Sequence, residues 1–210
     1  MKKIIVLLLV AMTCQSCWFW EEAERLEEEE RRQRELMAML SLGKTTIVDP
    51  SSGETSYVDP IGAQVGIECK IVEVNKKSSL TTGLNFGIQG ADYVDPGITG
   101  TVKLSYLNVP LLYSYDFSKN IFAEVGLQPG LLISARDKYN GHNDNYSDAI
   151  KKIEVGLPVG VGYRLNDKID LGIRAILGLT NINSNGEGND HNLLVVARVR
   201  YAIDLSELKK

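Results

Sequence analysis

Seven charged residues in the C-terminal half of the chain lie in stretches where every second residue is apolar. The charged residues, together with small ones, occupy the positions between the apolar residues. They are Glu124, Glu154, Arg164, Asp170, Arg174, Arg198 and Arg200. A charge in an enclosed interior is costly unless it is paired or hydrated. The spacing therefore indicates a satisfied network of salt bridges or, as the functional alternative, a narrow gated path lined by charge.

The residues that could carry acid–base chemistry do not form a catalytic constellation. The two histidines, His142 and His191, lie in stretches of loop composition, and so do the neighbouring pairs Ser147–Asp148 and Asp190–His191. General acid–base catalysis requires such groups to be held within hydrogen-bond reach of one another. We therefore expect no catalytic residues and no enzyme activity.

Potential metal ligands are equally sparse. Four acidic loop residues could bind calcium weakly, but their spacing supports no dedicated site; they are Asp144, Asp148, Glu187 and Asp190. Cys69 has at most Cys17 as a partner, because Cys14 falls within the N-terminal apolar segment. The sequence predicts no metal site, no cofactor and no disulfide framework.

Seven stretches alternate apolar with polar or small residues at a period of two, which is the pattern of β-strands with one apolar face. They span residues 61–71, 80–89, 107–115, 121–136, 153–165, 169–180 and 193–203. In the longest, Val125, Ile133 and Ala135 fall on the apolar side and Arg136 on the other. Strands in globular proteins usually run about five or six residues, whereas a strand crossing a bilayer needs about nine to eleven.

The arrangement of charges, turns and tyrosines favours a membrane protein. The apolar sides of the last four stretches carry no charge, and short turns (NKKSS, DFSKN, LNDK) alternate with long polar loops, as in transmembrane barrels. Four tyrosines on the apolar side near the short-turn or terminal end are expected to form an interfacial aromatic girdle: Tyr113, Tyr115, Tyr163 and Tyr201. We predict an all-β, antiparallel up-and-down transmembrane β-barrel; a soluble barrel or sandwich is the alternative that periodicity leaves open.

The predicted barrel has eight strands, because bacterial barrels have an even number. The eighth is expected between Met39 and Val48, where the alternation is poor. Pro110, Pro129 and Pro158 are unusual in a closed barrel, since proline lacks the amide donor that a ladder requires. We expect them at bulges or at the rim.

The sequence YLNVPLLYSY, followed by a short turn and IFAEVGLQPGLLISAR, resembles the PorT-like, or porin-family, outer-membrane β-barrel proteins. The resemblance covers roughly residues 61–203 and rests on a Pro-Leu-Leu strand followed by a glycine-spaced one. It implies a bacterial outer-membrane location, contact with outer-membrane lipid and a partner protein in envelope assembly or secretion.

The N-terminal region divides into two expected segments before the barrel. Residues 1–17 have the basic start, apolar run and polar end of a signal peptide, and Cys17 is a possible lipidation site. Residues 18–42 carry Glu and Arg at helical spacing, which predicts a solvated helical spacer. The barrel is expected over residues 43–204, with a polar tail at 205–210.

An eight-stranded barrel has an interior just wide enough for side chains to fill. We therefore expect a small outer-membrane barrel with a structural, surface-binding or envelope-assembly role, and not a large-pore channel. The alternative is a lipid-anchored or periplasmic barrel that binds an apolar ligand. The net charge of -4 gives no nucleic-acid signal, and the oligomeric state is not encoded in any pattern that we recognise.

Overall fold

The computed structural model describes residues 36–48, 56–58, 60–95, 98–145, 147–184 and 189–203. The predicted signal peptide, Cys17, most of the predicted helical spacer and the polar tail lie outside these residues. No helix in the described part of the chain is long and apolar enough to cross a membrane.

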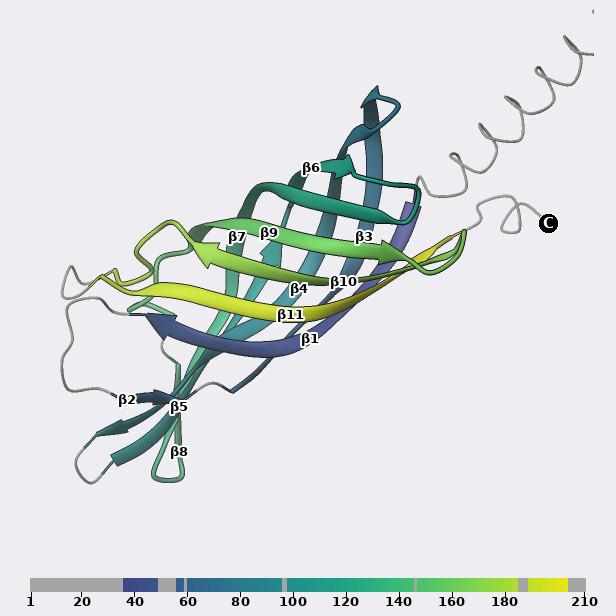
Figure 1. Ribbon diagram of the computed structural model, residues 1–210. Coiled ribbons are helices and arrows are strands. Elements are labelled where there is room, and N and C mark those ends of the chain that lie inside the picture. The colour runs from purple at the N-terminus through teal and green to yellow at the C-terminus, as the bar shows by residue number, and fades with distance from the viewer. Residues whose placement is uncertain are drawn as a thin grey trace, which may run out of the picture.

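The chain forms one antiparallel sheet that closes on itself (Figure 1). Its strands are β1 (Leu36–Val48), β2 (Ser56–Val58), β3 (Ile61–Asn75), β4 (Ser78–Asp95), β5 (Ile98–Asn108), β6 (Leu111–Asp116), β7 (Ile121–Tyr139), β8 (His142–Asn145), β9 (Ile153–Arg164), β10 (Ile169–Gly178) and β11 (His191–Ala202). The ring runs β1, β3, β4, β5, β7, β9, β10 and β11, and β11 pairs back to β1. The predicted eight-position, all-β barrel is confirmed.

The strands β5 and β6 occupy one position of the ring, since both pair with β4 on one side and with β7 on the other. They are separated at Val109 and Pro110, and Pro129 of β7 lies opposite this break. The amide of Val109 donates to the carbonyl of Pro129 at 2.9 Å. Two prolines that lack donors thus share one interruption, which limits the loss of ladder hydrogen bonds.

The third proline lies in β9, at a gap in its pairing with β7. Register partners run through Val125 with Val159 and resume at Gln128 with Gly156, so Pro158 falls between them. Pro158 still pairs with Ile176 on the other side of β9. All three prolines therefore lie where a ladder is already interrupted, rather than at the rim.

The first strand begins earlier than the sequence indicates. β1 starts at Leu36, so residues 36–42 are strand and not the end of a helical spacer, and the boundary predicted at residue 43 is wrong. Strand pairing explains the difference, because Met37 and Met39 are buried between β3 and β11. Burial of these side chains outweighs the helical spacing of the charged residues before them.

The apolar faces of the strands point away from the barrel axis. Leu40, Val65, Val125, Val159 and Ile173 are exposed, whereas the neighbouring inward positions are buried. The outer wall is thus apolar and the inner wall is polar. This is the reverse of a soluble sandwich, which buries its apolar face.

The predicted alternation fails at one point in β7. Ser105 of β5 pairs with Ser134, but Tyr106 pairs with Leu132, so Ile133 is an extra residue at a β-bulge. Ile133 is 56% exposed, and beyond it Ala135 is fully buried while Arg136 is exposed. The sequence pattern placed Ala135 on the outer wall and Arg136 inside; both assignments are wrong, because the bulge reverses the facing of every later residue.

The ends of β4, β5 and β7 extend past the barrel with the short strands β2 and β8, as an outer lobe seen at the lower end of Figure 1. The stretch from Asp137, which the sequence predicted as a polar loop, begins as a hairpin between β7 and β8. Asn140 and Gly141 form its turn with positive φ angles of 46° and 84°. Asn-Gly is the preferred pair for such a two-residue turn, because both residues tolerate a left-handed backbone.

Candidate functional site

Inward-facing glycines on β9 and β10 make room for larger side chains from other strands. A Cβ atom at Gly162 would lie 2.1 Å from the Phe122 ring, and one at Gly160 would lie 3.1 Å from Glu124 Oε1. At Gly172, a Cβ atom would approach Arg198 Nη2 to 3.3 Å. The alternation of glycine with long charged residues therefore lets Glu124 and Arg198 reach across the lumen.

Five hydrogen bonds between charged groups join six buried side chains at the centre of the barrel. Arg174 donates through Nη1 to Glu68 Oε1 at 2.9 Å and through Nε to Glu124 Oε1 at 2.6 Å. Arg198 Nη1 also donates to Glu124 Oε1, at 2.5 Å. Arg200 donates to Glu68 Oε2 at 3.2 Å and to Asp170 Oδ2 at 3.0 Å. We call these residues the ion network.

The ion network is balanced in charge, with three carboxylates and three guanidinium groups. Its pairs connect β3, β7, β10 and β11, so they join opposite walls of the barrel. Carboxylates held by two or more arginines are compensated for the loss of water, which a single buried charge is not. The same contacts thus cross the lumen and hold its walls together.

Two of the seven charged residues singled out in the sequence lie outside this network. Glu154 accepts hydrogen bonds from Gln89 at 2.7 Å and from Asn192 at 3.0 Å, and no cation of the described residues contacts it. Arg164 pairs with Asp116 at 2.6 Å, near the short turns. The other five, Glu124, Asp170, Arg174, Arg198 and Arg200, lie together.

Glu68 completes the network and was not among the seven candidates. The alternation of residues 61–71 does place Glu68 on the inward side, together with Gln64 and Gly66. The signal was therefore present. The seven candidates all lie on the four C-terminal strands, whereas the closed barrel brings β3 within reach of β10 and β11.

An apolar cluster lies inside the barrel at the end where the long loops are. Ile150 and Ile182, from the connections after β8 and after β10, are buried against Ile47, Leu104 and Tyr106. A backbone bridge between Ile150 and Asn183 ties the two connections together. We call this the loop plug; a smaller buried apolar cluster of Ile176, Leu194 and Val196 lies on β10 and β11.

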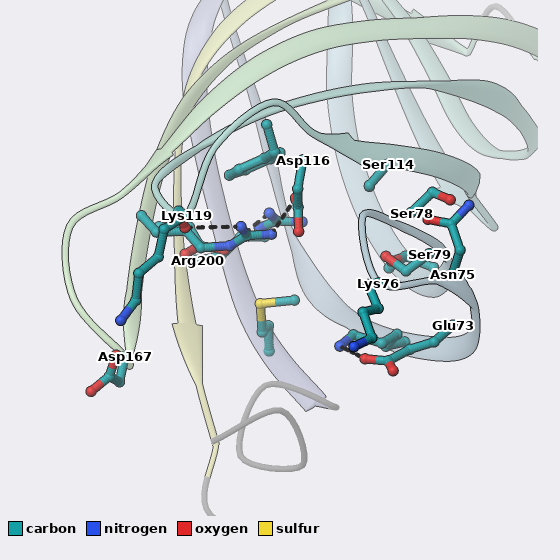
Figure 2. A pocket seen from close by; sticks show the side chains of 16 residues that line it. Glu73, Asn75, Lys76, Ser78, Ser79, Ser114, Asp116, Lys119, Asp167 and Arg200 are labelled. Carbon is teal, nitrogen blue, oxygen red and sulfur yellow. Dashed lines mark hydrogen bonds and ion pairs between the residues drawn. The ribbon is translucent and has the colours of Figure 1, made fainter. Parts of the chain in front are cut away.

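At the short-turn end, the lumen opens into a pocket of about 410 Å³ (Figure 2). Its deep wall includes Phe122 and Arg200, and the guanidinium carbon of Arg200 lies 4.9 Å from the centre of the Phe122 ring. Lys76, Lys119 and Asp167 lie at its walls. Because Arg200 belongs to the ion network, the pocket ends where the network begins.

The four tyrosines of the predicted girdle are exposed on the outer wall, with exposed fractions of 38% to 48%. Tyr113 and Tyr115 lie on β6, just before the turn at residues 116–120, and Tyr163 lies just before the turn at 165–168. Tyr201 pairs with Ile169, which follows that turn. All four are therefore at the short-turn end, and their interfacial role is part of the proposal below.

The other residues considered in the sequence form no site in the described structure. The ring of His191 contacts the carbonyl oxygen of Gly178 at 3.0 Å and Asn189 at 3.1 Å, and the Ser147 hydroxyl contacts the backbone of Ala135. Within the described ranges, no three His, Cys, Asp or Glu side chains gather as metal ligands.

Residues 36–184 match the family described as outer membrane protein beta-barrel domain. The chain belongs to this family. The match places the protein in the bacterial outer membrane, where its apolar outer wall contacts lipid. No curated protein matches the chain in sequence.

Solved outer-membrane proteins are similar to this chain. Neisserial surface protein A (NspA) is 15% identical, with a TM-score of 0.57 over 80% of this chain and 97% of that one. Ail of Yersinia pestis, solved with the heparin analogue sucrose octasulfate, is 11% identical over 80% and 98% of the chains, with a TM-score of 0.49. The outer membrane enzyme PagL is 14% identical over 80% and 99%, with a TM-score of 0.45. At these identities the likeness concerns the fold alone.

Proposed function

We propose that this outer-membrane barrel works through its surface, as a binding or assembly component of the cell envelope, and that its lumen does not conduct. The observation that carries the proposal is the ion network, which crosses the lumen between the loop plug and the pocket. A passing solute would have to separate these pairs. Removing one partner of a buried pair costs about 3–5 kcal/mol, so spontaneous opening is rare.

The surface role is supported by the distribution of structure outside the barrel wall. The outer lobe and the two connections before β9 and after β10 lie at one end of the molecule, whereas the other end has short turns. Long loops on the extracellular side and short periplasmic turns are the usual arrangement of such barrels. The PorT-like resemblance extends this proposal to a partner protein in secretion, and the sparse catalytic chemistry supports a protein that is not an enzyme.

The polar lumen argues against an apolar-ligand carrier. The ion network and amide side chains occupy the centre of the lumen, and the buried apolar side chains, in the loop plug and in a second cluster of Ile176, Leu194 and Val196, pack against the chain's own residues. An apolar ligand would have to displace Ile150 and Ile182 or desolvate the ion network. Neither gives it a preformed apolar cavity, which such ligands require.

The test is conductance of the purified full chain in planar bilayers. We expect no stable large conductance and at most rare small openings. The double variant Glu68→Gln/Glu124→Gln, which leaves three arginines without their shared acids, should raise the frequency of openings. Glu73→Gln, which removes an acid whose ion pair with Lys70 lies near the surface, is the matched control and should leave the record unchanged. A steady large conductance in the unmodified protein would refute the closed lumen.

A further inference from the structure

Three basic side chains lie together on the outer wall, where β5 and β7 pass from the barrel into the outer lobe. Lys103 of β5 and Arg136 of β7 are register partners, and Lys138 lies opposite Thr101 on the same face. All three are exposed, while their neighbours Leu104 and Ala135 are fully buried. We call Lys103, Arg136 and Lys138 the basic patch.

The β-bulge at Ile133 creates this patch. Without the extra residue, Arg136 would follow the alternation of the part of β7 before the bulge and point into the lumen. With it, Arg136 points outwards, directly opposite Lys103. Bulges commonly re-aim a side chain in this way.

The basic patch has no protein partner in the described part of the chain. Asp137 lies between Arg136 and Lys138 in sequence but points to the other face, where the Tyr93 hydroxyl donates to it at 3.1 Å. Asp92 lies on the same face as the patch, opposite Thr101, and makes no ion pair with a described residue. Like charges directly opposite on neighbouring strands lie about 5 Å apart and repel each other, so an anion bound between them would be stabilised.

The position of the patch indicates which anion. Leu131 and the bulged Ile133, which come just before it on β7, are exposed on the lipid-facing wall. Lys151 and Lys152 are exposed just before the neighbouring β9. The carbonyl of Lys152 accepts a hydrogen bond from the amide of Leu132. The basic groups therefore lie at the edge of the apolar band nearest the outer lobe, at the level of lipid headgroups.

We propose that Lys103, Arg136 and Lys138 bind the phosphate groups of a phosphorylated glycolipid in the outer leaflet of the outer membrane. Arginine binds phosphate through two parallel hydrogen bonds and lysine binds it as a point charge, so the pair can hold one headgroup phosphate between them. The site rests on the proposed topology, in which the outer lobe faces the cell exterior. It does not depend on whether the lumen conducts.

The experiment measures lipid binding to the full chain in detergent by native mass spectrometry. The probes are bisphosphorylated lipid A, the same lipid without phosphates, phosphatidylglycerol and inorganic phosphate. The triple variant K103Q/R136Q/K138Q is compared with the wild type and with K77Q/K119Q/K168Q, a control that removes three positive charges from the short turns. Heat-modifiability gels without lipid check folding; the triple variant should be at least as heat-stable as the wild type, since it loses a like-charge pair.

We expect the wild type and the control to bind phosphorylated lipid A about 100-fold more tightly than the triple variant, from the typical contribution of each basic residue near a charged lipid surface. Equal binding by wild type and triple variant, or equal binding of lipid A with and without phosphates, would overturn the proposal. Equal affinity for phosphatidylglycerol would assign the patch to inner-leaflet lipid, and tight binding of inorganic phosphate to a free anion. Either result would also overturn it.

Discussion

At the scale of single residues, the stability of the barrel depends on whether each charge has its partners. Glu124 accepts from both Arg174 and Arg198 and is almost completely buried. Replacing Glu124 with Gln leaves two guanidinium groups short of a counter-charge in the lumen. We expect the free energy of unfolding to fall by about 3–5 kcal/mol, measured by urea unfolding in lipid vesicles. The matched control, Glu73→Gln, lies near the surface and should cost about 0–1 kcal/mol; equal losses for both would contradict the buried network.

A charge introduced on the lipid-facing wall should destabilise the protein. Val159 is exposed on the outer wall and pairs with Val125 and Ala175 in the middle of the strands. Val159→Arg should cost about 2–4 kcal/mol, because the charge lies near the middle of the bilayer. The same unfolding measurement applies, with Val159→Leu as a control that keeps the side chain apolar. A neutral arginine at this position would mean that Val159 does not face lipid.

At the scale of elements, the bulge in β7 determines which side chains after Ile133 point into the barrel and which point outwards. Deleting Ile133 should restore unbroken alternation. Either the part of β7 before the bulge or the part after it must then reverse the direction of its side chains. Arg136 would then enter the loop plug or Glu124 would face lipid. We expect the folded fraction on a heat-modifiability gel to fall strongly, whereas Ile133→Ala, which keeps the bulge, should fold. A deletion variant that folds as well as the wild type would show that the bulge is dispensable.

The connections between strands predict the direction of insertion. Protease added to intact cells should cleave between residues 140 and 151 or between 183 and 192, and should spare the turns at 116–120 and 165–168, if the long-loop end faces outwards. The fragments are identified by mass spectrometry after extraction. Cleavage at the short turns first would invert the topology, and with it the leaflet that the basic patch contacts.

At the scale of the whole molecule, the sequence predicts the barrel well because membrane and lumen impose one rule on every strand. Apolar side chains alternate with polar ones, and this period identified β3, β4, β6, β7, β9, β10 and β11. It missed β5 (Ile98–Asn108), and β1 was placed only by the need for an even number of strands. Bulges do not follow the rule, so Ala135 and Arg136 were assigned to the wrong faces. The start of β1 was also missed, because residues 36–42 become strand through pairing with β3 and β11 rather than through their own pattern.

The site was predictable only in part, for a related reason. Alternation shows that Glu124, Arg174, Arg198 and Arg200 share the inner face, but it does not show which of them meet. Glu154 and Arg164 share that face and lie at different heights, one near Gln89 and Asn192 and the other near Asp116. Glu68 joins the network from β3 because the barrel closes through β1 and β11. Height along the barrel depends on the register of the strands, which the period alone does not reveal.

The orientation of the two faces is the central claim, and cysteine labelling in the membrane tests it most directly. In a Cys69→Ser background, Val159→Cys places a thiol on the outer wall and Ser41→Cys places one on the buried inner face. Ser41 is chosen because a side chain at Gly160 would crowd Glu124. A lipid-soluble maleimide, scored against the background without an added cysteine, should modify Val159→Cys and leave Ser41→Cys unlabelled. Labelling of Ser41→Cys with protection of Val159→Cys would contradict the account.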